Sequence, residues 1–318
     1  MRVLVTGSTG FVGRALCPAL IQAGHQVIAL VRNPNAPGLP EGADVHVIDD
    51  IGPNTDWTAA LSGADAVMHL AARVHMVDED LSNAEFQFTR VNTGGTARLA
   101  EAAAAAGIHR FVYLSTIKVM GERSTAPMRE SDAPQPEGPY AVSKLAGERA
   151  LIDAAAGTGL ETVILRPPLV YGPGTKSNFL ALLKICQMAP PLPFASVRNK
   201  RSIIYLGNLI DALILCLTAD KAAGETYFVG DEQDLSTADL LRHVAGAMGR
   251  PARLFPLPLG LIRLAGVLTG KSEAISILLS DLQVEKEKIH RQLGWNPPFN
   301  VVQGLKETAA WFSTGNSP

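Results

Sequence analysis

Short apolar runs and longer helical periodicities alternate along the first half of the chain. Runs rich in Val, Ile and Leu that are bounded by turn residues predict buried strands, whereas apolar residues recurring every three or four positions predict helices. The expected strands are Val3–Thr6, Gln26–Val31, Val45–Ile48, Ala66–Leu70, Phe111–Ser115 and Glu161–Leu165. Strands that alternate with helices indicate a parallel sheet covered on both faces, as in doubly wound α/β folds.

Three helices are expected among these strands: Val12–Ala23, Glu85–Ala106, and a stretch from Tyr140 to about Ala156. The first is expected to end before Gly24, because glycine often stands directly after the last residue of a helix. The second is rich in alanine, the strongest helix former. The order of strands and helices therefore predicts a Rossmann-type sheet.

The pattern changes after Arg166-Pro167-Pro168, where prolines cluster at 190–193. The elements expected beyond this point are strands at Ser202–Tyr205 and Thr226–Val229, a helix at Leu209–Leu217, and further helices. We infer a larger domain at residues 1–167 that also receives parts of about 202–230. A smaller, interleaved, mostly helical region is expected from residues 168–201 and 231–318.

The amino-acid composition argues against some classes of protein but does not indicate a particular function. The net charge of −2, with 47% hydrophobic and 18% charged residues, is that of a soluble globular protein and gives no electrostatic case for binding nucleic acid. The 3 cysteines argue against a disulfide framework, suit a reducing cytoplasm and show no metal-ligand spacing.

The apolar stretch Leu257–Gly270 is broken by Arg263 and falls short of the ~20 residues of a membrane span. It predicts a packed helix and no membrane insertion.

The segment between the first strand and the first helix is rich in glycine. It reads Gly7-Ser8-Thr9-Gly10-Phe11-Val12-Gly13. Three glycines at a spacing of three let the backbone turn tightly and approach a pyrophosphate at a helix N-terminus. Because the segment directly follows a β-run, it predicts dinucleotide binding by residues 1–167.

The residues after the second and third strands bear on the choice of cofactor. An acidic side chain after the second strand would bind the ribose hydroxyls of NAD, but here Val31 is followed by Arg32. A guanidinium pairs with a 2′-phosphate, which favours or at least tolerates NADP. Arg32 as a solvated loop cation is the other interpretation. Asp50 is placed either to accept a hydrogen bond from the adenine amino group or to cap a turn.

Tyr140 and Lys144 lie four residues apart and so share one face of the expected helix. An ammonium beside a phenol favours the phenolate and lowers the tyrosine pKa from its usual ~10, which makes it a proton acceptor for a sugar hydroxyl. The spacing alone is a weak signal. Ser115-Thr116 ends the fifth strand, at the edge where ligands bind such sheets, so Thr116 and Tyr140 are expected to hold one sugar oxygen between them.

A longer set of motifs follows the same order along the chain. The set comprises residues 6–13, Asp50-Ile51, His69-Leu70-Ala71-Ala72, Val-Asn-Thr-Gly-Gly-Thr at 91–96, Leu114-Ser115-Thr116, Tyr140 to Lys144, and Arg-Pro-Pro-Leu-Val-Tyr-Gly-Pro at 166–173. With these motifs the chain resembles the extended short-chain dehydrogenase/reductase family, in its NAD-dependent epimerase/dehydratase group acting on nucleotide sugars. The set is specific for the family and much less specific for the substrate.

The resemblance implies roles for the matched residues. Thr116, Tyr140 and Lys144 would be catalytic, with Tyr140 as the acid/base and Lys144 on the nicotinamide ribose. Together with the residues argued above, the expected dinucleotide-binding residues are Gly7, Gly10, Phe11, Val12, Gly13, Arg32, Asp50, Ile51, Leu70, Ala71, Ala72, Asn92, Tyr140, Lys144 and Pro167. The expected substrate-binding residues are Thr116, Lys118, Tyr140, Asn178 and Arg201. Asn178 and Arg201 match positions that hold a substrate diphosphate, although Arg201 as a surface cation is the alternative.

Some residues depart from the pattern of UDP-galactose 4-epimerases. The acidic residue after the second strand is missing, Met120 replaces a usual tyrosine, and Leu169 replaces a frequent asparagine. Lys118 places a charge beside Thr116. The segment 115–119 looks more like the C4 reductases that make UDP-N-acetylquinovosamine for bacterial surface polysaccharide.

The predicted function is NAD(P)-dependent hydride transfer at C4 of a UDP-hexose derivative, by a 4-keto reductase of that type. A UDP-sugar 4-epimerase is the alternative, since the same residues serve both reactions. A non-catalytic dinucleotide-binding sensor is a second alternative, weakened because the Tyr–Lys pair is kept. The resemblance also implies a homodimer formed through a four-helix bundle.

Overall fold

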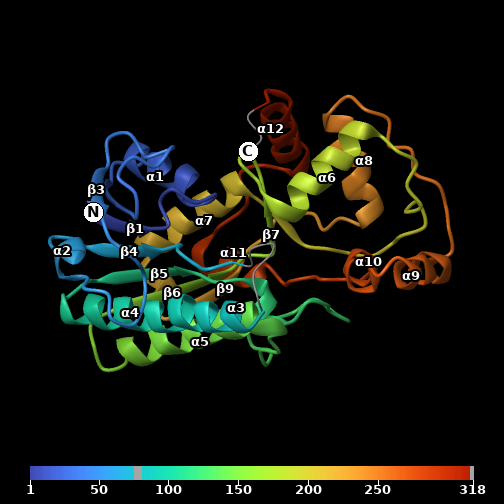
Figure 1. The fold of residues 1–318 in the computed structure, drawn as a ribbon. Coiled ribbons are helices and arrows are strands. Elements are labelled where there is room, and N and C mark those ends of the chain that lie inside the picture. The colour runs from blue at the N-terminus through green and yellow to red at the C-terminus, as the bar shows by residue number, and fades with distance from the viewer. Residues whose placement is uncertain (75–80, 316–318) are drawn as a thin grey trace.

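The computed structural model describes residues 1–74 and 81–315. A parallel sheet of 7 strands crosses one half of the molecule in the order β3-β2-β1-β4-β5-β6-β9 (Figure 1). The strands are β1 (Arg2–Thr6), β2 (Gln26–Val31), β3 (Asp44–Val47), β4 (Ala66–His69), β5 (Arg110–Leu114), β6 (Glu161–Arg166) and β9 (Glu225–Phe228). Because strand order reverses between β1 and β4, a ligand crevice is expected at the carboxyl ends of these two strands. The predicted doubly wound α/β class is confirmed.

Helices cover both faces of this sheet (Figure 1). On one face, α1 (Gly13–Gln22) and α7 (Leu206–Thr218) bury a core that includes Leu16, Leu20 and Leu213. On the other face, α4 (Thr96–Ala105) and α5 (Gly138–Ala155) pack over Phe111 and Tyr113, with the short α2 (Thr58–Leu61) at the edge. The strands therefore read as nearly continuous apolar runs, because both of their faces are buried.

The helix expected over Glu85–Ala106 is interrupted. The chain forms α3 (Leu81–Phe88), then a π-helical turn at Thr89–Gly95, then α4. A Cβ on Gly95 would lie 2.6 Å from Cγ2 of Ile51, so this backbone approaches the segment that follows β3 too closely for a side chain. Such π-turns often occur at functional sites, and this one carries Asn92.

The remaining elements form the second half of the molecule (Figure 1). Two short parallel strands, β7 (Leu169–Tyr171) and β8 (Ile203–Tyr205), pair apart from the main sheet. The helices of this half are α6 (Ser177–Met188), α8 (Thr237–Ala247), α9 (Leu259–Leu268), α10 (Ser272–Leu279) and α12 (Val301–Ser313), whereas α11 (Glu287–Leu293) packs against β9 of the main sheet. β7 was not expected from the sequence, because three residues beside two prolines carry almost no period-2 signal.

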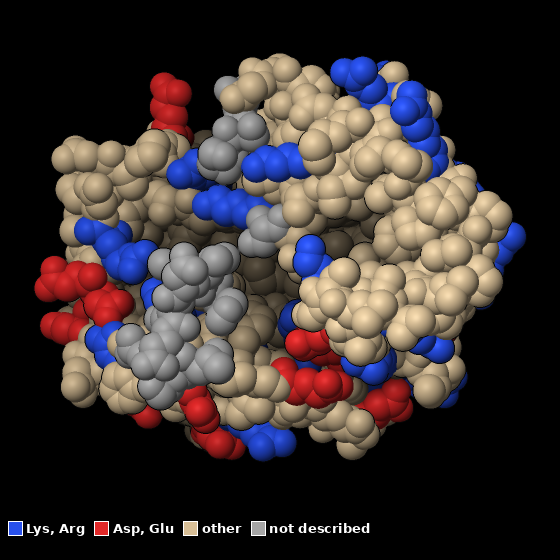
Figure 2. All heavy atoms as spheres, turned by 45° about the vertical axis from the view of Figure 1, so that its right-hand side comes forward, with Lys and Arg blue, Asp and Glu red and all other residues tan. Residues whose placement is uncertain are grey.

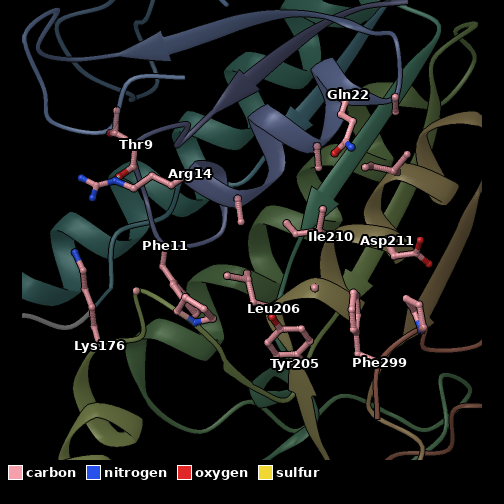
Figure 3. Close-up of a pocket in the computed structure, with 18 residues that line it drawn as sticks. Thr9, Phe11, Arg14, Gln22, Lys176, Tyr205, Leu206, Ile210, Asp211 and Phe299 are labelled. Atoms are coloured by element: carbon pink, nitrogen blue, oxygen red, sulfur yellow. The ribbon is translucent and has the colours of Figure 1, made fainter. Parts of the chain in front are cut away.

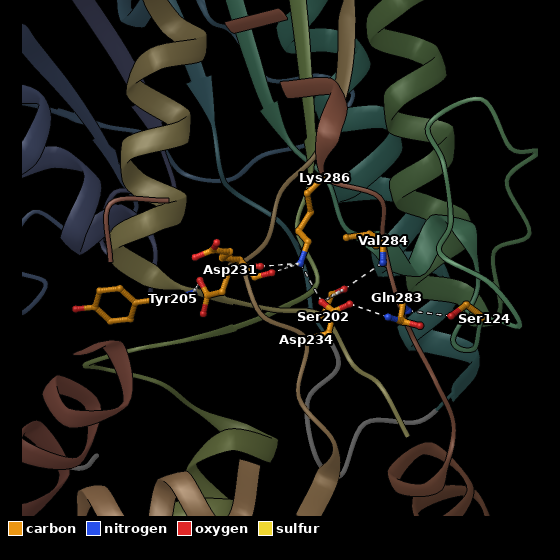
Figure 4. Close-up of polar contacts among 9 residues, drawn as sticks. Ser124, Ser202, Tyr205, Asp231, Asp234, Gln283, Val284 and Lys286 are labelled. Carbon is orange, nitrogen blue, oxygen red and sulfur yellow. Dashed lines mark hydrogen bonds and ion pairs between the residues drawn. The ribbon is translucent and has the colours of Figure 1, made fainter. Parts of the chain in front are cut away.

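A polar cluster fastens the C-terminal half to the sheet (Figure 4). Lys286 Nζ donates to the Asp231 carbonyl at 2.7 Å and forms an ion pair with Asp234 at 3.0 Å. The fully buried Asp231 carboxylate accepts hydrogen bonds from the Tyr205 N–H and the Tyr171 hydroxyl. Because each partner comes from a different segment, this cluster sets the position of the C-terminal half relative to the sheet.

The helix predicted within Leu257–Gly270 is present as α9, but it is not packed as expected. Only Ile262 and Gly266 of its residues are buried. The sequence could not show this, since an apolar helix packs only where another element covers it. Within the described residues, no helix combines the length and apolar character needed to cross a bilayer.

Candidate active site

The glycine-rich loop forms a tight cradle at the N-terminus of α1. Gly7 has a φ of +70°, a conformation that favours glycine, and a Cβ there would lie 2.9 Å from the Ala71 nitrogen. A Cβ on Gly13 would lie 2.2 Å from the Gly7 oxygen, and the Gly10 N–H donates to that same oxygen at 2.9 Å. The loop therefore brings backbone close to the end of β4 and leaves N–H groups at a helix N-terminus. Such a cradle fits a dinucleotide pyrophosphate.

A buried relay supports the residues that follow β4. The Thr6 hydroxyl accepts from the Ala71 N–H at 3.1 Å and lies 2.7 Å from His69 Nδ1, while His69 Nε2 lies 2.9 Å from the Thr96 hydroxyl. Burial, aided by the Lys144 charge, lowers the pKa of His69 to about 3, so its ring stays neutral. These hydrogen bonds join β1, β4 and α4, and the bond from Ala71 attaches to them the expected cofactor loop of Leu70, Ala71 and Ala72.

Asn92 joins that loop to α5. Its Oδ1 accepts from the Arg73 N–H at 2.7 Å, and its Nδ2 donates to the Arg73 carbonyl at 3.0 Å and to the Ser143 hydroxyl at 3.0 Å. Ser143 in turn donates to the Tyr140 carbonyl at 2.8 Å. The buried Asn92 side chain thus holds the segment after β4 and the Tyr140 helix together, a role that the sequence did not reveal.

The predicted adenosine ligands lie at the far end of the sheet. Asp50 forms an ion pair with Arg90 at 2.6 Å and accepts from the Ile51 N–H at 2.8 Å. Asp50 and Arg90 line a hollow of about 450 Å³ beside β3. Arg32 directly follows β2 and is exposed to solvent. Both the cofactor interpretation and the turn or loop interpretation of these two residues are compatible with this placement.

Tyr140 and Lys144 lie on the first turns of α5, next to the end of β5. The Lys144 ammonium donates to the Leu114 carbonyl at 2.8 Å and sits 3.9 Å from the centre of the Tyr113 ring, a cation–π arrangement. Tyr140 packs edge-on against Phe88, with ring centres 6.0 Å apart. The predicted pair therefore stands on one helix at the carboxyl edge of the sheet.

The pKa of Tyr140 moves opposite to the expectation. Burial raises it to about 12, and burial lowers the pKa of Lys144 to about 7. Desolvation disfavours both charged forms, and a lysine that is only half charged near neutral pH favours a phenolate less than a fixed cation does. The prediction of a lowered tyrosine pKa took the helix spacing into account but not the loss of water.

The buried carboxylate of Glu148 offsets part of the effect of burial on Lys144. Glu148 lies one turn beyond Lys144, and its charge raises the pKa of Lys144 against the effect of burial. Arg166 donates to both Glu148 oxygens, at 2.9 and 2.5 Å, and Ser115 donates to the same carboxylate. Glu148, Arg166 and Ser115 thus connect α5, the end of β6 and the residue before Thr116. The (i, i+4) spacing of Lys144 and Glu148 was a usable signal, but the pairing with Arg166 was not visible in the sequence.

Thr116 lies two residues beyond the end of β5 and caps the N-terminus of a short 3₁₀ turn at Ile117–Met120. Its hydroxyl accepts from the Lys118 N–H at 3.3 Å, and the Lys118 side chain forms a 2.6 Å ion pair with Glu122. The Pro167 carbonyl accepts from the Ile117 N–H at 2.9 Å, which ties this loop to the end of β6. Thr116, Lys118 and Pro167 are thus brought to one edge of the sheet.

The two predicted diphosphate ligands come from the C-terminal half. Arg201 Nη1 donates to the carbonyls of Ile277 and Ser280, at 2.8 and 3.1 Å, and so caps the end of α10. Asn178 is exposed on the first turn of α6. Figure 2 shows a hollow between the two halves with Lys and Arg side chains around it, an environment suited to a phosphate-bearing molecule.

Phe11 lies just before the start of α1, and its ring lines a groove of about 770 Å³ between α1 and α7, with Leu206 and Phe299 on the other side (Figure 3). A Cβ on Gly174 would lie 3.6 Å from the Phe11 ring. Contact between Phe11 and a dinucleotide would therefore use its backbone. Among the described residues, no His, Cys, Asp and Glu side chains cluster as they would around a metal ion.

Comparison with known proteins decides the family. Residues 3–230 match the family described as "NAD dependent epimerase/dehydratase family". The chain belongs to this family. Its identification as an extended short-chain dehydrogenase/reductase is confirmed, and with it the enzyme class and the nicotinamide cofactor. The sensor alternative loses its support, while a preference for NADP over NAD stays a prediction.

Two relatives and one solved structure are similar to this chain. The chain is 37% identical to a Vibrio cholerae protein named UDP-glucose 4-epimerase, over 99% of this chain and 96% of the relative. It is 29% identical to the 2-alkyl-3-oxoalkanoate reductase of Stenotrophomonas maltophilia, over 98% and 99%. The crystal structure of UDP-glucuronic acid 4-epimerase from Bacillus cereus in complex with NAD shares the fold, with a TM-score of 0.80, 24% identity and coverage of 99% and 98%.

Proposed function

We propose that this family member transfers hydride at C4 of a UDP-hexose derivative and works as a 4-keto reductase of the UDP-N-acetylquinovosamine type. The observation that carries this proposal is Lys118, a cation in the turn that Thr116 begins. Its ion pair with Glu122 fixes the turn, and its N–H bonds to the Thr116 hydroxyl. The segment around it resembles the C4 reductases more than the galactose epimerases.

The proposed mechanism uses the residues at the edge of β5 and the start of α5. A nicotinamide cofactor held along the glycine cradle supplies the hydride. Tyr140 gives its proton to the sugar oxygen, and Thr116 donates a hydrogen bond to the same oxygen as negative charge develops. The Lys144 ammonium then favours the tyrosinate that remains, and Glu148 favours the charged form of Lys144.

We further propose a UDP group as the part of the substrate that Arg201 and Asn178 hold. A guanidinium suits diphosphate oxygens because it can bind them in a bidentate manner. The name of the Vibrio cholerae relative, UDP-glucose 4-epimerase, supports a UDP-sugar. That name also favours the second candidate function, a UDP-sugar 4-epimerase. An epimerase would use the same Tyr140 and Thr116, but it would retain its cofactor and return hydride to the other face of the sugar.

One assay separates the two reactions. Purified protein is incubated with UDP-4-keto-6-deoxy-N-acetylglucosamine plus NADH or NADPH, and separately with UDP-glucose or UDP-N-acetylglucosamine without added cofactor. The reductase proposal expects stoichiometric loss of reduced-nicotinamide absorbance in the first mixture and no C4 epimer in the second. Flat absorbance together with a C4 epimer formed without added cofactor would replace the reductase with the epimerase.

A variant of Arg32 tests the proposed preference for NADPH. Arg32→Ala should raise the KM for NADPH by roughly tenfold and leave the KM for NADH within about twofold, because only NADPH carries the 2′-phosphate. Steady-state kinetics with both cofactors measures this difference. Arg291→Ala, which removes another exposed arginine, is the matched control and should change neither value. Equal effects of Arg32→Ala on both cofactors would remove the proposed phosphate contact.

We also propose that the enzyme is a homodimer that pairs through the face of α3 and α5. Val142 and Ile152 of α5 and Phe86 of α3 are large apolar side chains exposed on this side. Exposed large apolar side chains on neighbouring helices are typical of an interface. Cytoplasmic location stays a prediction from the cysteine content.

A further inference from the structure

The α9–α10 hairpin lies at the outer edge of the C-terminal half (Figure 1). Its two helices pack on each other: a Cβ on Gly266 would lie 3.1 Å from Cγ1 of Ile275, so α10 approaches α9 at a glycine. Gly266 and Ile262 lie four residues apart and form the inner face of α9. The inner face is therefore already occupied.

The outer face of α9 is an apolar stripe turned toward solvent. It consists of Leu261, Leu264, Val267 and Leu268, whose exposed fractions are 50%, 52%, 64% and 79%. Spacings of three and four residues place these side chains on one side of the helix. A contiguous apolar face of this kind marks an interaction surface.

The hairpin and the segment before it are basic, although the whole chain has a net charge of −2. Between residues 250 and 279 the exposed charges are Arg250, Arg253, Arg263, Lys271 and a single carboxylate, Glu273. None of the four cations belongs to an ion pair within the described part of the chain.

Arg263 places a positive charge beside the apolar stripe of α9. At about 100° per residue, Arg263 lies at the border of the stripe, between Val267 on the outer face and Gly266 on the inner face. A long basic side chain at such a border can lay its aliphatic part along an apolar surface and extend its charge into a headgroup layer.

We propose that the α9–α10 hairpin docks on the surface of an anionic lipid bilayer, with the apolar stripe at the boundary between headgroups and acyl chains. α9 has 10 residues, so it is about 15 Å long and cannot span the ~30 Å core. A second copy of the chain is a poorer occupant, because a two-fold contact along the stripe would bring the Arg263 side chains of both copies together.

Docking would place the reaction hollow near the membrane. Arg201, the proposed diphosphate ligand, donates to two carbonyls at the end of α10, and the Asn199 amide donates to the carbonyls of Leu278 and Ser280. The hairpin is thus fastened to the segment that carries Arg201. The docking itself does not depend on which C4 reaction the enzyme performs.

Vesicle co-sedimentation tests this proposal. The full chain is mixed at about 0.15 M ionic strength with vesicles of phosphatidylcholine and phosphatidylglycerol in equal parts, or of phosphatidylcholine alone. We expect binding to the mixed vesicles to be at least about tenfold tighter, since the exposed cations of the hairpin, Arg263 and Lys271, act near the surface. Leu264→Gln with Leu268→Gln should weaken that binding by roughly tenfold or more, because the stripe loses its apolar side chains. Arg263→Glu should weaken it too, and more at low salt.

The controls separate docking from misfolding and from self-association. Val302→Gln changes an exposed valine of α12 and should leave vesicle binding unchanged. Thermal unfolding and turnover of the soluble substrate should be the same in all variants, since none of the changed residues is buried or belongs to the proposed active site. Equal binding to neutral and anionic vesicles, or no sedimentation of the intact protein, would overturn the proposal. It would also fail if light scattering showed that the double variant loses only a dimer.

Discussion

Tyr140→Phe should lower kcat by roughly 10³-fold while dinucleotide affinity stays within about twofold. General acid–base catalysis by a positioned side chain contributes ~10²–10⁴-fold to rate, and phenylalanine cannot supply the proton. The ring itself is kept, so the edge-on contact with Phe88 remains and the helix should fold as before. Turnover of the UDP-4-keto sugar measures the first effect, and titration of NADH fluorescence measures the second.

A tyrosine elsewhere provides the matched control. The Tyr227 hydroxyl donates to the Lys221 carbonyl at 3.3 Å on the edge strand β9. Tyr227→Phe removes the same atom away from the proposed site, and its kcat should stay within about twofold, as for other changes outside a catalytic group. Substantial activity in Tyr140→Phe would show that another group, with Thr116 as the first candidate, transfers the proton.

Glu148→Leu should destabilise the protein by about 3–5 kcal/mol, because it leaves the buried Arg166 guanidinium without its carboxylate. Both side chains are almost fully buried, at 2% and 8% exposure, and two hydrogen bonds join them. A typical domain is stable by only ~5–15 kcal/mol, so the loss is large. Urea unfolding measures it. Glu285→Leu breaks the exposed ion pair with Arg129 instead and should cost about 1 kcal/mol or less.

The milder Glu148→Gln tests the electrostatic role of the same residue. The negative charge of Glu148 raises the pKa of Lys144, so its removal should lower that pKa below about 7. If the ammonium form of Lys144 is the active one, activity falls as pH rises through its pKa. The alkaline limb of the kcat/KM profile should therefore move to lower pH in the variant. An unmoved limb, with stability still reduced, would leave Glu148 a structural role only.

Local sequence patterns predicted most of the sheet. The strand Gln26–Val31 has the bounds expected from its apolar run, and the helix expected from Tyr140 to about Ala156 begins only two residues earlier. Lys144 and Tyr140 face one side of that helix because helical spacing alone decides it. The brief β7 and the π-turn around Asn92 escaped prediction, since both depend on contacts with distant segments rather than on local periodicity.

What the sequence by itself determined is the order of strands and helices, the glycine cradle and the residue types at the edge of the sheet. These follow from hydrophobic periodicity and from the steric freedom of glycine, which are local properties. Only the tertiary structure decided how charge and water are distributed. It buried Lys144 and partly buried Tyr140, and so shifted both pKa values; it also joined Glu148 to Arg166 and left the outer face of α9 uncovered. Each of these depends on which side chains fold against one another, and sequence spacing carries no record of that.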